Sequence, residues 1–115
     1  MNLESDYVHA LLVRAPHEFP NVWLFRRNVG AGRLAERSYF RAGIPGQADL
    51  YGIGRGGRHY EIECKRFTGL SPAQKRWRDW CDERDVPWLL LRVELGELPA
   101  QTIERWVGEL RVFLV

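Results

Sequence analysis

The segment from residue 48 to residue 66 constrains the fold of this chain more than any other part of the sequence. Residues 48–53 and 58–66 both favour β-strands, and the glycine-rich residues 54–57 between them are typical of a hairpin turn. The segment therefore predicts two adjacent antiparallel strands. Because side chains alternate between the two faces of a strand, one face of the second strand is expected to carry Glu61, Glu63 and Lys65.

The residues before this hairpin predict a helix and two strands. Apolar residues at helical spacing favour a helix over residues 3–15, and Pro16 is expected to end it. Residues 22–28 and 37–42 favour strands because they are rich in aromatic and aliphatic side chains. Two glycines are expected to open a basic loop between these strands.

The residues after the hairpin predict a helix, a strand and a last helix. Residues 71–74 combine a capping serine, a proline at the first helical position and a capping-box glutamine, and this helix is expected to reach residue 84. It is expected to bury Trp77, Trp80 and Cys81. The apolar run 88–93 is typical of a strand covered on both faces, and residues 99–110 show helical spacing. This order predicts one α/β domain over residues 1–115, with helices flanking a mixed sheet.

The charge of the chain is unevenly distributed. Its formal net charge is only +2, but residues 26–58 carry seven basic and two acidic side chains. Clustered arginine and lysine favour a polyanionic partner, although an ordinary solvated surface explains the charge equally well. We find no apolar run of membrane-spanning length and no signal-peptide pattern. The two cysteines, Cys64 and Cys81, are interpreted as small buried residues in a reducing compartment.

Three side chains on the predicted hairpin have the chemistry that phosphodiester hydrolysis requires. Pairing of the two strands would bring Asp49, Glu63 and Lys65 together. Mg²⁺ prefers oxygen ligands, so Asp49 and Glu63 are candidate ligands, with the carbonyl of Cys64 as a further one. Lys65 is placed to orient a water or to stabilise developing negative charge. An acidic residue followed by Glu-x-Lys is also common on solvated strands. The spacing of these residues alone therefore does not distinguish a metal site from an ordinary solvated strand face.

The wider context of these residues resembles a known family. The whole arrangement is similar to the PD-(D/E)xK nuclease superfamily, and within it to the compact virus-type replication-repair nuclease (VRR-NUC) domains. The matching segments cover most of the chain up to residue 93: residues 23–28, 43–50, 60–65 and 70–74. The resemblance implies a restriction-endonuclease-like αβββαβ core. Ala48 stands where the superfamily pattern has proline, a departure that changes no ligand.

The resemblance also implies roles for individual residues. Asp49 and Glu63 would bind Mg²⁺ or Mn²⁺, Lys65 would be catalytic, and Gln74 would belong to the same motif as well as to the capping box. The family places a further carboxylate on the first helix near the metal. Glu4 is the preferred candidate here, and Asp6 is the alternative.

Four other residues are candidates for contact with DNA. Arg26, Arg27 and Arg33 are expected to contact phosphates, because guanidinium groups match phosphate oxygens. Asn28 is interpreted either as a substrate contact or as a turn residue. Glu61 shares the face of Glu63 and is interpreted either as a solvated side chain, which is the expectation we prefer, or as part of the site.

These observations lead to one expected function and to several alternative functions. The resemblance implies a metal-dependent DNA endonuclease, selective for branched DNA such as Holliday junctions, acting in DNA repair as a homodimer. Its setting would be the cytoplasm of a bacterial or phage-infected host cell. The competing functions are a non-catalytic nucleic-acid-binding module, or a nuclease that acts on RNA or on a specific duplex site. Apolar residues near the C-terminus, Trp106 and residues 112–115, would either form the dimer surface or complete the core.

Overall fold

The computed structural model of the chain describes residues 3–27, 30–35 and 38–115, and for the strand residues between 30 and 42 it describes the backbone alone. The helices in this part of the chain are α1 (Glu4–Glu18), α2 (Pro72–Glu83) and α3 (Pro99–Phe113). The strands are β1 (Trp23–Arg26), β2 (Gly30–Ala35), β3 (Ser38–Ala42), β4 (Leu50–Ile53), β5 (His59–Lys65) and β6 (Trp88–Arg92). None of the described helices is long and apolar enough to cross a membrane.

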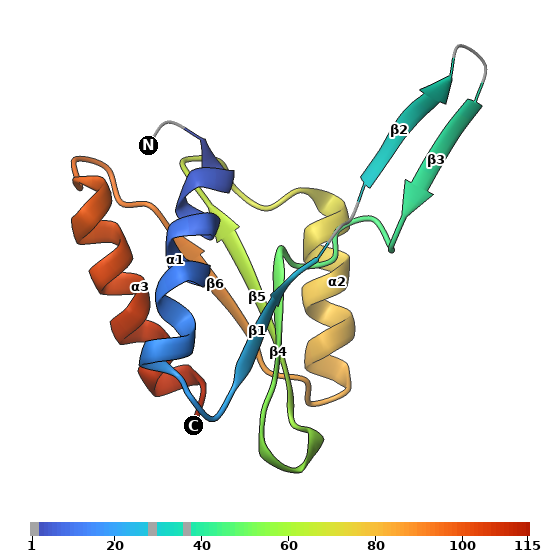
Figure 1. Ribbon diagram of the computed structural model, residues 1–115. Helices are drawn as coiled ribbons and strands as arrows, with labels where there is room; N and C mark the ends of the chain where they lie inside the picture. Colours follow the sequence, from blue (N-terminus) through green and yellow to red (C-terminus); the bar gives the residue numbers. More distant parts are fainter. Residues whose placement is uncertain (1–2, 28–29, 36–37) are drawn as a thin grey trace.

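Four of these strands form a mixed sheet in the order β1-β4-β5-β6. The hairpin predicted from residues 48–66 is confirmed, since β4 pairs antiparallel with β5. β6 pairs with β5 in parallel, and α2 makes the crossover that a parallel pair requires. Helices α1 and α3 cover one face of the sheet and α2 lies on the other (Figure 1). The predicted α/β class, with helices flanking a mixed sheet, is therefore confirmed at this level.

The hydrophobic core lies between the sheet and the layer formed by α1 and α3. Leu11 from α1, Ile62 from β5 and Trp106 from α3 are fully buried in this core. Trp106 therefore completes the monomer, while Val112 and Val115 remain exposed beyond it. Both cysteines are buried and free, as the sequence predicts.

The start of α2 is confirmed in detail. The Ser71 Oγ accepts a hydrogen bond from the Gln74 N–H at 3.1 Å, and the Gln74 Oε1 accepts one from the Ser71 N–H at 2.8 Å. This reciprocal pair is the predicted capping box, and it fixes the side chain of Gln74 against the first turn of the helix.

Three local expectations are wrong. α1 passes through Pro16 and ends at Glu18, because a proline in the last turn removes one hydrogen bond while the Phe19 N–H still donates to the Ala15 carbonyl at 2.8 Å. The expected loop around residues 30–35 is strand β2, which pairs with β3 in a hairpin that projects from the body of the molecule (Figure 1). Trp80 is 51% exposed, because α2 turns its opposite side to the sheet.

Candidate active site

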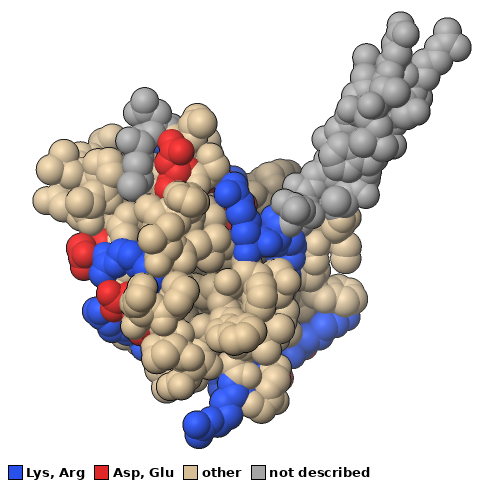
Figure 2. Space-filling view, in the orientation of Figure 1, with Lys and Arg blue, Asp and Glu red and all other residues tan. Residues whose placement is uncertain are grey.

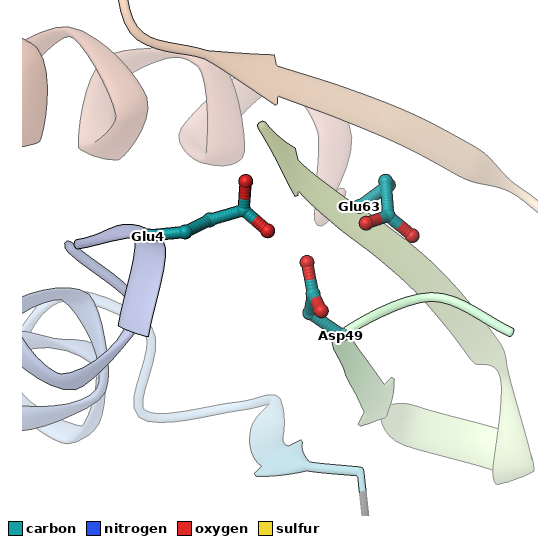
Figure 3. Close-up of side chains that lie close together, drawn as sticks. All are labelled: Glu4, Asp49 and Glu63. Carbon is teal, nitrogen blue, oxygen red and sulfur yellow. The ribbon is translucent and has the colours of Figure 1, made fainter. Parts of the chain in front are cut away.

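Three carboxylates from separate elements converge at one end of the sheet. Glu4 comes from the first turn of α1, Asp49 immediately precedes β4, and Glu63 lies on β5. One oxygen from each of them lies within 4.8 Å of the others. Figure 3 shows the three side chains pointing toward a common space. We call Glu4, Asp49 and Glu63 the carboxylate trio.

The pairing of β4 with β5 explains how the trio is assembled. Leu50 pairs with Ile62, so the residue before Leu50 lies beside the residue after Ile62. The backbone N–H of Cys64 donates to Asp49 Oδ2 at 3.0 Å, which orients that carboxylate. The backbone N–H of Arg66 donates to Glu4 Oε2 at 3.3 Å, which draws the start of α1 toward the end of β5.

Glu63 is held in an environment that disfavours its charge. Its side chain is 1% exposed, and its Oε2 is buried without a hydrogen-bond partner in the described part of the chain. Burial raises the pKa of Glu63 to about 9, and the neighbouring Asp49 contributes to this rise. Burial and the charge of Asp49 also raise the pKa of Glu4. Repulsion between the three groups would be relieved by a cation among them.

The trio fits a divalent cation such as Mg²⁺ or Mn²⁺. Its donors are all carboxylate oxygens, which these ions prefer, and Glu63 Oε2 is a buried acceptor that lacks a donor among the described residues. Of the two candidates on the first helix, Glu4 is the one that joins the trio. Asp6 instead accepts a hydrogen bond from the Leu3 N–H at 3.1 Å. The carbonyl of Cys64 lies on β5 beside the trio and stays a predicted ligand.

Gln74 connects the trio to α2. While its Oε1 caps the helix, its Nε2 donates to Glu63 Oε1 at 3.4 Å. Gln74 can therefore cap α2 and also belong to the predicted active-site motif. Lys65, the last residue of β5, is partly buried and close enough for its charge to lower the pKa of both Glu63 and Glu4. The structure thus brings Asp49, Glu63, Lys65, Gln74 and Glu4 into one region.

A second buried carboxylate lies two residues away on the same face of β5. Glu61 is completely buried, so the expectation of a solvated side chain is wrong. Arg27 pairs with it through both guanidinium nitrogens, with Nη2 donating to Oε2 at 2.8 Å. His59 and Trp77 also bond to it, the indole Nε1 of Trp77 at 2.9 Å from Oε1. Burial acts to raise the pKa of Glu61, but these hydrogen bonds outweigh it and hold the pKa below its ordinary value.

The predicted DNA contacts divide into three cases. Arg27 is engaged by Glu61 and also donates to the Ala48 carbonyl at 3.1 Å, so its guanidinium has structural partners. Arg26 is exposed at the end of β1. Asn28 lies outside the described residues, as does the side chain of Arg33. Strand alternation was the available signal for the Arg27–Glu61 pair, since both residues belong to the same face of the sheet.

Comparison with models of known protein families finds no match to this chain, and comparison with curated protein sequences finds none either.

Proposed function

We propose that this protein is a metal-dependent endonuclease that hydrolyses phosphodiester bonds in DNA. The observation that carries the proposal is the carboxylate trio, three acidic side chains brought within 4.8 Å of one another from three different elements. Repulsion makes three ionised carboxylates at this distance costly, and either a proton or a bound cation would relieve it. The resemblance of the surrounding motifs to VRR-NUC domains supports the same activity.

Each residue of the region has a part in this proposal. Glu4, Asp49 and Glu63 would hold Mg²⁺ or Mn²⁺, with the Cys64 carbonyl as a further ligand. When bound, such an ion neutralises charge on a phosphate and lowers the pKa of an attacking water. Lys65 would orient the water and stabilise negative charge on the phosphate. Gln74 would fix the orientation of Glu63 through its amide.

The charge around the trio supports a nucleic-acid substrate. Basic atoms lie beside the base of the β2–β3 hairpin and acidic atoms lie nearer the N-terminus (Figure 2). The hairpin itself carries Arg33 and Arg41 in its sequence. We further propose that the substrate is branched DNA, such as a Holliday junction met in DNA repair, and that two copies act together because one centre cuts one strand. A cytoplasmic location in a bacterial or phage-infected cell is part of the same proposal.

A panel of labelled substrates tests the activity. Junctions, flaps, single strands, duplex DNA and RNA of matched sequence would be incubated with the protein in Mg²⁺, in Mn²⁺ and in EDTA. We expect cleavage of branched DNA that requires the metal, and binding that weakens steeply with salt as counterions are released. Binding without cleavage of any substrate would favour a non-catalytic module. Preferential cleavage of RNA would indicate a ribonuclease, and cleavage of one duplex sequence would indicate a sequence-specific endonuclease.

A further inference from the structure

The sheet face that carries Glu63 is covered along only part of its width. α2 packs against β6 and reaches β5 through the Trp77–Glu61 hydrogen bond. Toward the other edge of the sheet the same face is open, and Trp23 on β1 is 72% exposed there. Ile53 on β4, which pairs with Trp23, is exposed as well. Large apolar side chains are therefore exposed together on this face, an arrangement that is typical of binding surfaces.

Aromatic side chains form a continuous row across this open face. Phe25 and Tyr51 stack with their centroids 5.1 Å apart, and Tyr51 and His59 stack at 5.9 Å. Trp23 extends the row at the edge, with its ring centroid 6.5 Å from that of Phe25. We call Trp23, Phe25, Tyr51 and His59 the aromatic row. Its exposed end presents an indole ring to solvent.

A groove of about 420 Å³ lies beside the exposed end of the row. It is lined by Asn21, Trp23, Phe25, Ile53, Gly54 and Arg55. No acidic residue is among these lining residues, and Arg55 is exposed in the turn that joins β4 to β5. The groove therefore combines aromatic rings with a guanidinium group, the two features that bind the bases and the phosphates of a nucleic-acid strand.

The aromatic row lies on the same face of the sheet as Asp49 and Glu63 of the carboxylate trio. Tyr51 follows Asp49 by two residues and His59 precedes Glu63 by four, so alternation places them on the same face of the sheet. Glu61 lies between the row and the trio, but its charge is compensated by Arg27, whose guanidinium lies 4.8 Å from the centroid of the Tyr51 ring. An anionic strand along this path meets no uncompensated carboxylate before the trio, within the part of the chain whose side chains are described.

We propose that the open face binds an unpaired DNA strand, with a base stacked on Trp23 and a phosphate on Arg55. This inference rests on the proposed function, since it assigns the open face to the same substrate. A second copy of the chain is the other occupant that an exposed aromatic face suits. The observations favour DNA, because the groove has a basic group and the row shares the sheet face of Asp49 and Glu63.

Binding of a short oligodeoxythymidine to the full chain tests this inference. Fluorescence anisotropy would be measured in EDTA, so that no cleavage occurs, for the wild type and for Trp23→Ala, Trp23→Phe and Arg55→Ala. We expect Trp23→Ala to weaken binding about tenfold, as loss of one stacked base implies. Trp23→Phe retains a stacking ring and should stay within about threefold of the wild type. Arg55→Ala should weaken binding and reduce its salt dependence.

Two variants serve as matched controls. Trp80→Ala removes an exposed tryptophan from α2, and Arg111→Ala removes a charge from α3 on the opposite side of the sheet. We expect both to bind the oligonucleotide as the wild type does. Equal affinity of Trp23→Ala and the wild type would overturn the inference. So would sedimentation of the wild type as a dimer that Trp23→Ala dissociates, because a second copy would then cover the row.

The two proposals fail in different ways. If Trp23→Ala loses affinity for the single strand but the wild type cleaves no DNA with any metal, the open face binds DNA and the proposed function is wrong. If the wild type cleaves with metal and Trp23→Ala cleaves a single-stranded flap with an unchanged KM, the function stands and this inference is wrong.

Discussion

Glu61 and Glu63 lie two residues apart on the same face of β5, and both are buried. Glu61 is surrounded by donors: Arg27, His59 and Trp77 all bond to its two oxygens. Glu63 faces two other carboxylates, those of the trio, and its Oε2 has no partner among the described residues. The pKa values respond in opposite directions, with that of Glu61 lowered and that of Glu63 raised to about 9.

On the proposed function, this difference separates a structural carboxylate from one that would bind a ligand. A buried charge that is fully bonded holds elements together, here β5, α2 and the end of β1. A buried carboxylate crowded by others costs stability, and such strain is typical of sites adapted to a ligand. Four sets of substitutions test this contrast, beginning with the largest expected effect.

Substitution of Asp49 or Lys65, the residues beside Glu63, should nearly abolish DNA cleavage. We expect Asp49→Asn and Lys65→Ala each to lower the rate of metal-dependent DNA cleavage on the order of a thousandfold, because each removes a group that we propose to act on the phosphate or its cation. DNA binding in EDTA should be largely retained. The measurement is single-turnover cleavage of the best substrate in the panel. A wild-type rate in either variant would mean that the centre lies elsewhere.

Substitution at Glu61 should instead unfold the protein more easily. Glu61→Ala leaves the largely buried Arg27 without its partner, so we expect the free energy of unfolding to fall by about 4 kcal/mol. Glu83→Ala is the control, because Glu83 forms an exposed ion pair with Arg84 and should contribute less than about 1 kcal/mol. Denaturant titration measures both. Equal effects of the two substitutions would show that the Glu61 network is not structural.

Substitution of Gly46 tests how closely the segment before Asp49 packs against the first turn of α2. Its φ is +88°, and a Cβ added there would lie 2.2 Å from the carbonyl oxygen of Ala73 in the first turn of α2. We expect Gly46→Ala to destabilise the protein by about 3 kcal/mol, from backbone strain and from the collision. Gly56→Ala has a similar φ of +70° but open space around it, so its cost should be about 1 kcal/mol. Similar midpoints of thermal unfolding for the two variants would contradict this close approach.

Glu63→Gln should have the smallest effect and the opposite sign. Without metal, folding at neutral pH forces the buried Glu63 carboxyl to take up a proton because its pKa is raised to about 9. The neutral amide needs no proton, so we expect the free energy of unfolding at neutral pH to rise by about 1 kcal/mol. Urea titration in EDTA measures the change. A marked loss of stability would place Glu63 in the same structural class as Glu61.

The sequence predicted the strand hairpin, the capped helix α2 and the alternation of β5, because each depends on local chemistry that residues 48–74 contain. The family resemblance implied a carboxylate on the first helix with a slight preference for Glu4 over Asp6, and Glu4 is the one that lies in the trio. The sequence did not predict the burial of Glu61, because that depends on Arg27 and Trp77 from distant segments. The path of α1 through Pro16 was missed for the same kind of reason, since tertiary packing of residues 15 and 19 in the core outweighs one lost hydrogen bond.

Titration of Mn²⁺ into the metal-free protein by calorimetry tests most directly whether the carboxylate trio is a cation site. The wild type and the Glu63→Gln variant would be compared at the same pH, with Glu83→Ala as a control for the loss of one surface charge. We expect Mn²⁺ to bind the wild type and the control, and to bind Glu63→Gln at least about tenfold more weakly, on the order of the loss expected for one carboxylate ligand. Equal affinity for Mn²⁺ in all three proteins, or no binding to the wild type, would contradict a cation site at the trio.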